Sequence, residues 1–117
     1  MTSSAETAKM VRLVNHSAIK MQLDTGAIAI NGEDVAQVIS GNEDIIGHVH
    51  LSEPNLIPLG RSAVNHADVA AVLNRMLPQR IATIEMLVSK NENALMVIDE
   101  SLKFVTEHYR KTPGDVS

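Results

Sequence analysis

The chain of 117 residues is 44% hydrophobic and 21% charged, with a net charge of −4, which is typical of one globular domain and argues against disorder. It contains no cysteine, so disulfides and thiolate chemistry are excluded and any metal site must use His, Asp or Glu. It has no basic stripe and only 2% aromatic residues, so nucleic-acid binding is not expected. It also lacks the apolar core of a signal peptide and the roughly 20 apolar residues of a membrane span, so we expect a cytoplasmic protein without a membrane partner.

Hydrophobic periodicity predicts one helix followed by three strand–helix pairs. In chain order these are a helix over residues 3–16, a strand over 18–23, a helix over 32–39, a strand over 44–51, a helix over 65–77, a strand over 81–88 and a helix over 92–109. A long loop with two prolines covers residues 52–64, and residues 111–117 are expected to form a disordered tail. Such alternation predicts one α/β domain over residues 1–117, with a parallel sheet and helical crossovers.

Polar side chains stand at or near the ends of all three predicted strands. Asp24 follows the first strand, His48 and His50 lie in the second, and Glu85 lies in the third. Residues two apart in a strand face the same side, so the two histidines point together. Functional groups of parallel α/β domains gather at the carboxyl ends of the strands, where a carboxylate, an imidazole and a second carboxylate could bind a divalent cation.

Each of these residues also has a purely structural interpretation. Asp24, before Thr-Gly, could be a turn or helix-entry residue, and a histidine in a strand is often only a satisfied polar group. Glu85 is the most informative, because it interrupts an apolar run and a buried carboxylate needs a partner. The sequence places His16 and His66 at surface or capping positions and His108 on an exposed final helix.

Three short motifs resemble one known family. Residues 47–55 (GHVHLSEPN) are similar to the His-x-His…Glu-x-Asn strand and loop of xylose-isomerase-like sugar isomerases and epimerases, especially the ketohexose 3-epimerases. Residues 23–26 (LDTG) and 83–86 (TIEM) resemble the preceding and last strand ends of that family. The order and spacing of the three motifs make the resemblance specific, and it covers nearly the whole chain. It implies a partial TIM barrel, made of the last three β/α units and the preceding helix, with parallel strands and outer helices.

The resemblance also implies roles for six residues. Asp24, His50 and Glu85 match three of the family's four metal ligands, and Glu85 also matches one of two carboxylates that move a proton at the carbon next to a carbonyl. The remaining matches, His48, Glu53 and Asn55, are expected to bind substrate. The implied cofactor is a divalent metal, with Mn the first expectation and Mg, Co, Fe or Zn as alternatives. The implied small-molecule partner is a sugar or sugar phosphate.

The chain departs from the family pattern in three ways. The first five strands, with the fourth metal carboxylate, have no counterpart, since a complete barrel needs about 250 residues. Ala27 stands where a histidine is common, and Leu56 stands where an arginine is common. The sequence therefore leaves open whether the chain is an enzyme.

Two functions remain on sequence grounds. One is a metal-dependent sugar isomerase or epimerase, incomplete as a lone chain, that acts as an oligomer or with a missing N-terminal half-barrel. The other is a non-catalytic truncated barrel that serves as an assembly or structural module. Self-association is expected through open strand edges and through a predicted apolar inner face of the sheet. That face would contain Ile19, Met21, Ile46, Val49, Ile81 and Ile84.

Overall fold

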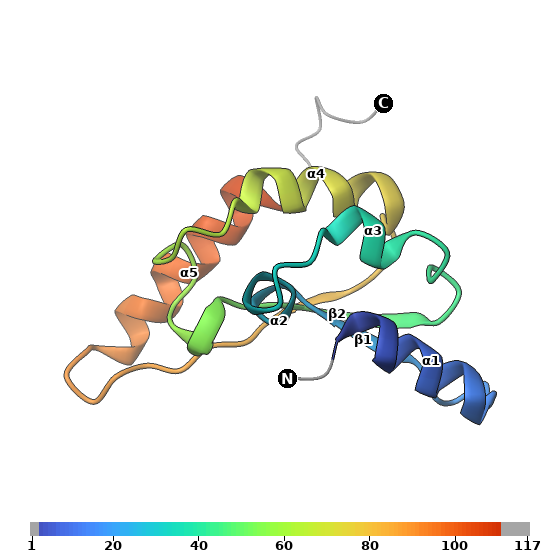
Figure 1. The fold of residues 1–117 in the computed structure, drawn as a ribbon. Coiled ribbons are helices and arrows are strands. Elements are labelled where there is room, and N and C mark those ends of the chain that lie inside the picture. The colour runs from blue at the N-terminus through green and yellow to red at the C-terminus, as the bar shows by residue number, and fades with distance from the viewer. Residues whose placement is uncertain (1–2, 111–117) are drawn as a thin grey trace.

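The computed structural model describes residues 3–110, so the expected disordered tail at 111–117 lies outside the described residues. The chain order is a helix first and then three strands, each followed by helical structure, and the colours of Figure 1 follow the chain from its N-terminus to its C-terminus. The elements are α1 (Ser4–Val14), β1 (Met21–Asp24), α2 (Thr25–Ile30), α3 (Val35–Ile39), β2 (Ile46–Leu51), the 3-10 helix η1 (Pro54–Leu56), α4 (His66–Met76), β3 (Ala82–Ile84) and α5 (Ala94–His108). No helix in this part of the chain is long and apolar enough to cross a membrane.

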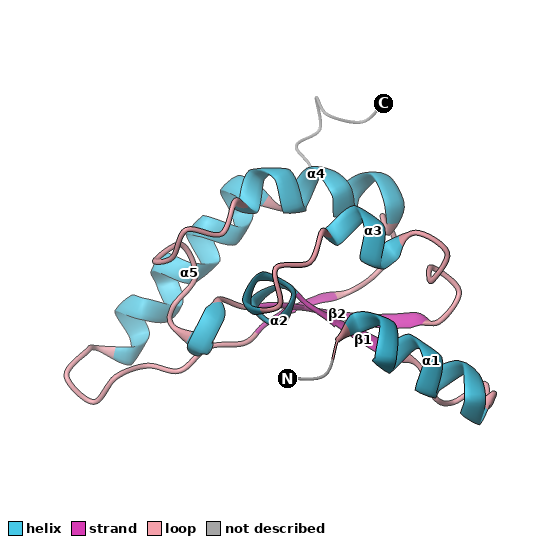
Figure 2. Cartoon of the chain, in the orientation of Figure 1, coloured by secondary structure: helices cyan, strands magenta, loops and turns pink. Residues whose placement is uncertain are grey.

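The three strands form one parallel sheet in the order β1-β2-β3, which confirms the predicted fold class. Asp24 pairs with His50, and Leu51 pairs with Ile84, so the carboxyl ends of neighbouring strands lie side by side. Figure 2 shows α3 and α4 together on one side of this sheet. Because consecutive strands are neighbours joined by helical crossovers, the chain forms part of a (β/α) barrel.

The first crossover contains two short helices instead of the single predicted helix over residues 32–39. Asp24 caps α2 at its N-terminus, and Asp34 caps α3 by accepting a hydrogen bond from the backbone N–H of Gln37. Gly32 lies between the two helices with a φ of 65°, a left-handed conformation that glycine adopts without strain. The predicted helix therefore begins too early, because the turn glycine is part of the link between the two helices.

The apolar residues of β1 and β2 face the helices. Met21, Leu23, Ile46, Val49 and Leu51 are all at most 3% exposed and form the centre of the core. The opposite face of the sheet carries the exposed residues Gln22 and His48 and the half-buried His50. The prediction of an apolar inner face available for self-association is therefore wrong. Of the six residues proposed for it, Met21, Ile46 and Val49 are covered by the chain's own helices, Ile84 is half-buried, and only Ile19 and Ile81 are exposed.

The third strand is shorter than the predicted range of 81–88. Its three residues Ala82, Thr83 and Ile84 lie at the open edge of the sheet, and the first two are exposed. Beyond Ile84 the ladder continues only as the hydrogen bond from Glu85 N to Leu51 O at 3.0 Å. An edge strand with one neighbour has half the backbone pairing of a central strand, so the residues after Glu85 leave the sheet as a loop.

Candidate metal site

The ends of the three strands bring one imidazole and two carboxylates together on the open face of the sheet. Asp24 ends β1, His50 is its partner on β2, and Glu85 directly follows β3. Each offers one donor atom, and these three atoms all lie within 4.8 Å of one another. The alternating direction of side chains in the strands and the parallel register place them on one face. The expectation that these residues converge is thus met in the structure.

The imidazole of His50 makes two close polar contacts through the same ring nitrogen. Its Nδ1 lies 3.0 Å from Oε2 of Glu85 and 3.1 Å from Nε2 of Gln22. A neutral ring nitrogen either donates a proton or accepts one, so it cannot both donate to the carboxylate and accept from the amide. A cation that binds the lone pair of Nδ1 and an oxygen of Glu85 would relieve this conflict. The two side chains are 22% and 43% exposed, so a cation can reach them from solvent.

Asp24 is held in place by α2 and by the segment that follows β2. Its Oδ1 accepts hydrogen bonds from the backbone N–H of Ala27 at 2.9 Å and from the hydroxyl of Ser52 at 2.7 Å. No hydrogen bond to Oδ2 occurs among the described residues. The interpretation of Asp24 as a helix-entry residue is thus also correct, because one oxygen caps α2 while the other is left available.

Thr25 and Gly26 hold the end of β1, which carries Asp24, close to Ser52, which follows β2. The hydroxyl of Thr25 donates to the carbonyl of Ser52 at 2.7 Å and accepts from its backbone N–H at 2.8 Å. A Cβ at Gly26 would lie 2.6 Å from the backbone oxygen of Glu53 and 2.7 Å from Oγ of Ser52, so only glycine fits there. The close approach fixes the distance between the ends of β1 and β2, and with it the position of the carboxylate.

This donor set fits a divalent cation. Two carboxylates and one imidazole are ligands that suit Mn, Mg, Fe, Co and Zn, and hydrogen bonds from Ala27 and Ser52 orient the carboxylate of Asp24, as ligands of protein metal sites require. The site lies on the exposed face of the sheet. A separate recess of about 530 Å³ lies between α2, α3 and α4, and none of the three donor residues lines it.

The residues expected to bind substrate lie in different surroundings. His48 is exposed beside the site, with its Nε2 3.1 Å from the hydroxyl of Thr83 and its ring 5.2 Å from the ring of His50. Asn55 is exposed on η1 in a left-handed conformation, with a φ of 62°. Both are available to a ligand from solvent.

Glu53 differs from the expectation, because its side chain is fully buried and points into the protein. Its Oε2 accepts from the backbone N–H of Gly60 at 2.6 Å and lies 2.9 Å from Nε2 of His66, while Oε1 accepts from the hydroxyl of Ser62 at 2.5 Å. A carboxylate with these contacts and no exposed surface cannot contact a substrate in this conformation. It anchors the loop after β2 to α4.

His66 completes the buried network, and its prediction as a surface or capping residue is wrong. It is 3% exposed, and its Nδ1 contacts the hydroxyl of Tyr109 near the end of α5. Burial, together with the nearby charge of Glu53, raises the pKa of Tyr109 well above its ordinary value. His16 is exposed, as predicted, whereas His108 is half-buried and stacks on Phe104 at 4.0 Å.

Sequence reasoning missed several residues that shape the site, namely Gln22, Thr25, Ser52 and Thr83. For Gln22 a signal was present, because it stands two positions before Asp24 in an alternating strand and so faces the same side. Thr25 and Ser52 carry no such signal, since short hydroxyl residues after a strand are common in turns.

Parallel strands with crossover helices, and polar donors at the carboxyl ends, define part of a (β/α) barrel. Similar solved structures are sugar epimerases. A D-psicose 3-epimerase from Clostridium cellulolyticum H10 superposes with a TM-score of 0.80 at 18% identity, over 95% of this chain and 45% of that chain. A D-allulose 3-epimerase from Methylomonas sp. gives a TM-score of 0.75 at 24% identity, over 93% and 43%.

The 3-keto-D-glucoside 4-epimerase YcjR from E. coli gives a TM-score of 0.77 at 18% identity, over 92% of this chain and 40% of that chain. The chain thus has the fold of part of these (β/α) barrels and spans less than half the length of these enzymes. The sequence itself matches no protein-family model and no curated protein.

Proposed function

We propose that the chain is part of a metal-dependent sugar or sugar-phosphate isomerase or epimerase, which moves a proton at the carbon next to a carbonyl. The observation that carries the proposal is the convergence of Asp24, His50 and Glu85 within 4.8 Å at the carboxyl ends of three successive parallel strands. In barrel enzymes this end of the strands is where the active site lies. The similar solved structures, which are epimerases of D-psicose, D-allulose and a 3-keto-D-glucoside, point to the same substrate class.

Glu85 is the proposed base for the proton transfer. Its side chain is 43% exposed on the open face, and its partner His50 lies 3.0 Å away. The carboxylate would take the proton from the carbon, and the electron pair of the C–H bond would move into the carbonyl to form an enediolate. In an epimerisation a second proton is then delivered to the opposite face of that carbon, and we assign its donation to a group in the part of the barrel beyond this chain, while Glu85 keeps the proton that it removed.

Asp24, His50 and Glu85 would bind a divalent metal, with Mn as the first candidate and Mg, Co, Fe or Zn as alternatives. When bound, such a cation supplies a Lewis acid that polarises the carbonyl oxygen of the substrate. His48 and Asn55, which are exposed, are proposed to donate hydrogen bonds to the sugar hydroxyls. Glu53 would support the substrate site only indirectly, by fixing the loop that carries Asn55.

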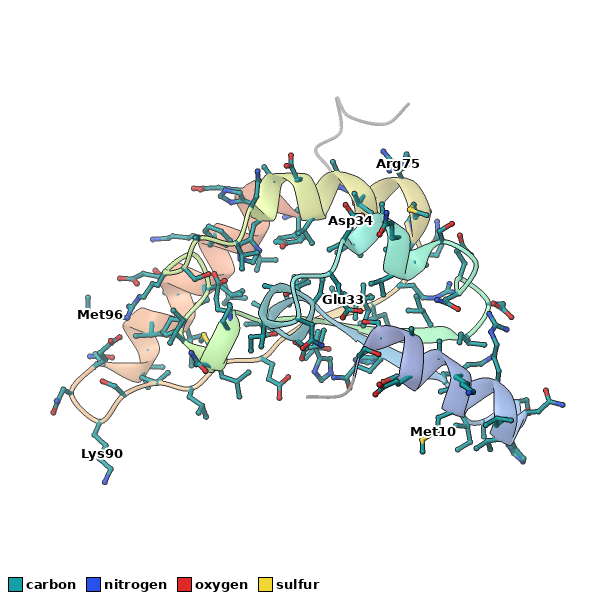
Figure 3. The ribbon with its side chains drawn as sticks, viewed as in Figure 1. Met10, Glu33, Asp34, Arg75, Lys90 and Met96 are labelled. Atoms are coloured by element: carbon teal, nitrogen blue, oxygen red, sulfur yellow. The ribbon has the colours of Figure 1, made fainter. Side chains whose placement is uncertain are left out.

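The chain is proposed to need a second polypeptide surface. Within residues 3–110 no further strand pairs with either edge of the sheet, and exposed apolar residues lie on the helices at either end of the molecule, as Met10 on α1 and Met96 on α5 illustrate in Figure 3. These two methionines are 68% and 62% exposed. Self-association, or pairing with the half of a barrel that this chain does not span, would cover such surfaces.

A non-catalytic assembly module is the second candidate. Two observations favour it. Ala27 and Leu56 offer no polar side-chain group to a substrate, and the carboxylate of Glu53 is buried in the core. In that case the fold and its donor set would serve assembly and not turnover.

Metal binding and proton exchange test the two candidates separately. Mn²⁺ binding is measured by calorimetry on the wild type, on His50→Ala and Glu85→Gln, and on the matched controls His16→Ala and Glu107→Gln, which change exposed residues away from the site. We expect both site variants to weaken binding at least tenfold, or about 1.4 kcal/mol, and the controls to leave it unchanged. No binding by the wild type would refute the metal site.

Proton exchange is measured by NMR as deuterium incorporation from D₂O into D-fructose and D-allulose at the carbon next to the carbonyl. Exchange that requires Mn²⁺ and is lost in Glu85→Gln supports the enzyme. Mn²⁺ binding without exchange, both for the chain alone and with an added N-terminal half-barrel, would favour the assembly module.

A further inference from the structure

Gln22 stands beside the candidate metal site and has no role in the chemistry considered so far. It lies two residues before Asp24 on β1, so both side chains point to the same open face of the sheet. The terminal amide of Gln22 reaches across to His50, with its Nε2 3.1 Å from Nδ1 of the imidazole. Gln22 is exposed, so its amide is not locked in place by packing.

The distances around Nδ1 match those between neighbouring ligands of one cation. A hard divalent cation such as Mg²⁺ binds its ligands at about 2.0–2.1 Å in octahedral geometry, so adjacent ligand atoms lie about 3 Å apart. The carboxylate of Glu85 lies 3.0 Å from Nδ1, and the amide of Gln22 lies 3.1 Å from it. The amide thus stands at the same spacing from the imidazole as a residue already assigned to the donor set.

The amide of Gln22 can present either of two atoms to this position. Its nitrogen donates hydrogen bonds and its oxygen accepts them, and rotation of the terminal bond exchanges the two. A cation that binds the lone pair of Nδ1 removes the acceptor for the amide N–H and repels its positive end. The same cation attracts the carbonyl oxygen, so the amide is expected to turn its oxygen toward the site.

We propose that Gln22 is a fourth protein ligand of the metal site and binds through its amide oxygen. This inference rests on the proposed function, because it requires that Asp24, His50 and Glu85 bind a cation. With it, four donors would come from this one chain, without a contribution from the rest of a barrel. A neutral oxygen in the fourth position also favours the oxygen-preferring cations Mg²⁺ and Mn²⁺.

The competing explanation is that Gln22 only orients the ring of His50 by a hydrogen bond. Two substitutions separate the explanations. Gln22→Met keeps a similar length and removes the amide oxygen. Gln22→Glu replaces the amide with a carboxylate, which cannot donate a hydrogen bond to Nδ1 but is a stronger ligand for a hard cation. Gln37→Met, an exposed glutamine on α3, is the matched control.

The experiment measures the Kd for Mn²⁺ by calorimetry, and by the electron paramagnetic resonance signal of free Mn²⁺, for the wild type and the three variants. Circular dichroism verifies that each variant is folded. We expect Gln22→Met to raise Kd about tenfold, Gln22→Glu to lower it, and Gln37→Met to leave it unchanged. The proposal is overturned if Gln22→Glu binds no more tightly than the wild type, or if Gln22→Met binds as the wild type does while His50→Ala and Glu85→Gln bind weakly. A wild-type chain that binds no Mn²⁺ removes the proposed metal site itself, and with it this ligand.

Discussion

Replacing Glu53 by glutamine tests the view that this residue stabilises the fold and does not contact substrate. Its side chain is 0% exposed, and its two oxygens contact Gly60, Ser62 and His66. The substitution keeps the volume but removes the charge, and it turns into an amide donor one of the two oxygens that accept from the backbone N–H of Gly60 and the hydroxyl of Ser62. A buried polar group left without a hydrogen-bond partner costs about 1–3 kcal/mol.

We therefore expect Glu53→Gln to lower the free energy of unfolding by about 1–3 kcal/mol. The assay is urea unfolding followed by circular dichroism. With a slope of about 1–3 kcal/mol per molar urea for a domain of this size, the midpoint should fall by at least about 0.3 M. Glu107→Gln, on an exposed position of α5, is the control and should change the free energy by less than about 0.5 kcal/mol.

The same variant separates a structural role from a role in binding. At low urea concentration, where Glu53→Gln is folded, its Kd for Mn²⁺ should stay within about threefold of the wild type, or about 0.7 kcal/mol. A variant as stable as the wild type that nevertheless no longer binds metal or sugar would refute the reasoning, because it would show that the carboxylate acts at the site and not in the core.

Three further predictions concern Tyr109, Gly26 and the assembly state. Because burial raises the pKa of Tyr109, the stability linked to its neutral phenol is present below its unfolded pKa of about 10 and is lost as the pH rises further. Tyr109 is the only tyrosine and no tryptophan is present, so ultraviolet absorbance follows the ionisation of this one residue. We expect the phenolate to appear together with unfolding, and Tyr109→Phe to unfold at a higher pH than the wild type. Phenolate formation in the folded chain would contradict this prediction. Gly26→Ala should cost about 1–3 kcal/mol in thermal unfolding and weaken Mn²⁺ binding, because the added Cβ displaces Ser52 and Glu53; an unchanged melting temperature would be inconsistent with that contact. Light scattering at micromolar concentration should give a mass above that of one chain. A single-chain mass would contradict self-association and leave a complementary half-barrel as the remaining partner.

The parallel sheet and the donor residues could be predicted because each depends on local pattern. Alternation marks β1, β-branched residues mark β2, and polar residues at strand ends stand out against apolar runs. Asp24 shows that two interpretations of one residue can both be correct. Its Oδ1 caps α2, and the residue also belongs to the donor set.

The faces of the sheet and the buried network could not be predicted in the same way. Alternation shows that Met21 and Gln22 face opposite sides, but it does not show which side the helices cover. The contacts among Glu53, His66 and Tyr109 join residues up to 43 positions apart, and nothing in the local sequence of any of them indicates the others. A motif match gave Glu53 a role at the substrate, whereas the fold places it in the core.

The short edge strand β3 has a consequence for the order in which the molecule opens. Both β1 and β3 pair with β2 alone, but β3 has only three residues and the first two are exposed, so amide hydrogen exchange should show this strand opening well before β1 and β2. Glu85, which follows it, contacts the central strand through its backbone N–H, which donates to the carbonyl of Leu51, and through its side chain, which contacts His50. A cation bound by both Glu85 and His50 would therefore connect the edge strand β3 to the central strand β2. Binding of the cation should slow amide hydrogen exchange most at residues 82–85. Occupancy of the metal site could then be measured as protection of the β3 edge of the sheet.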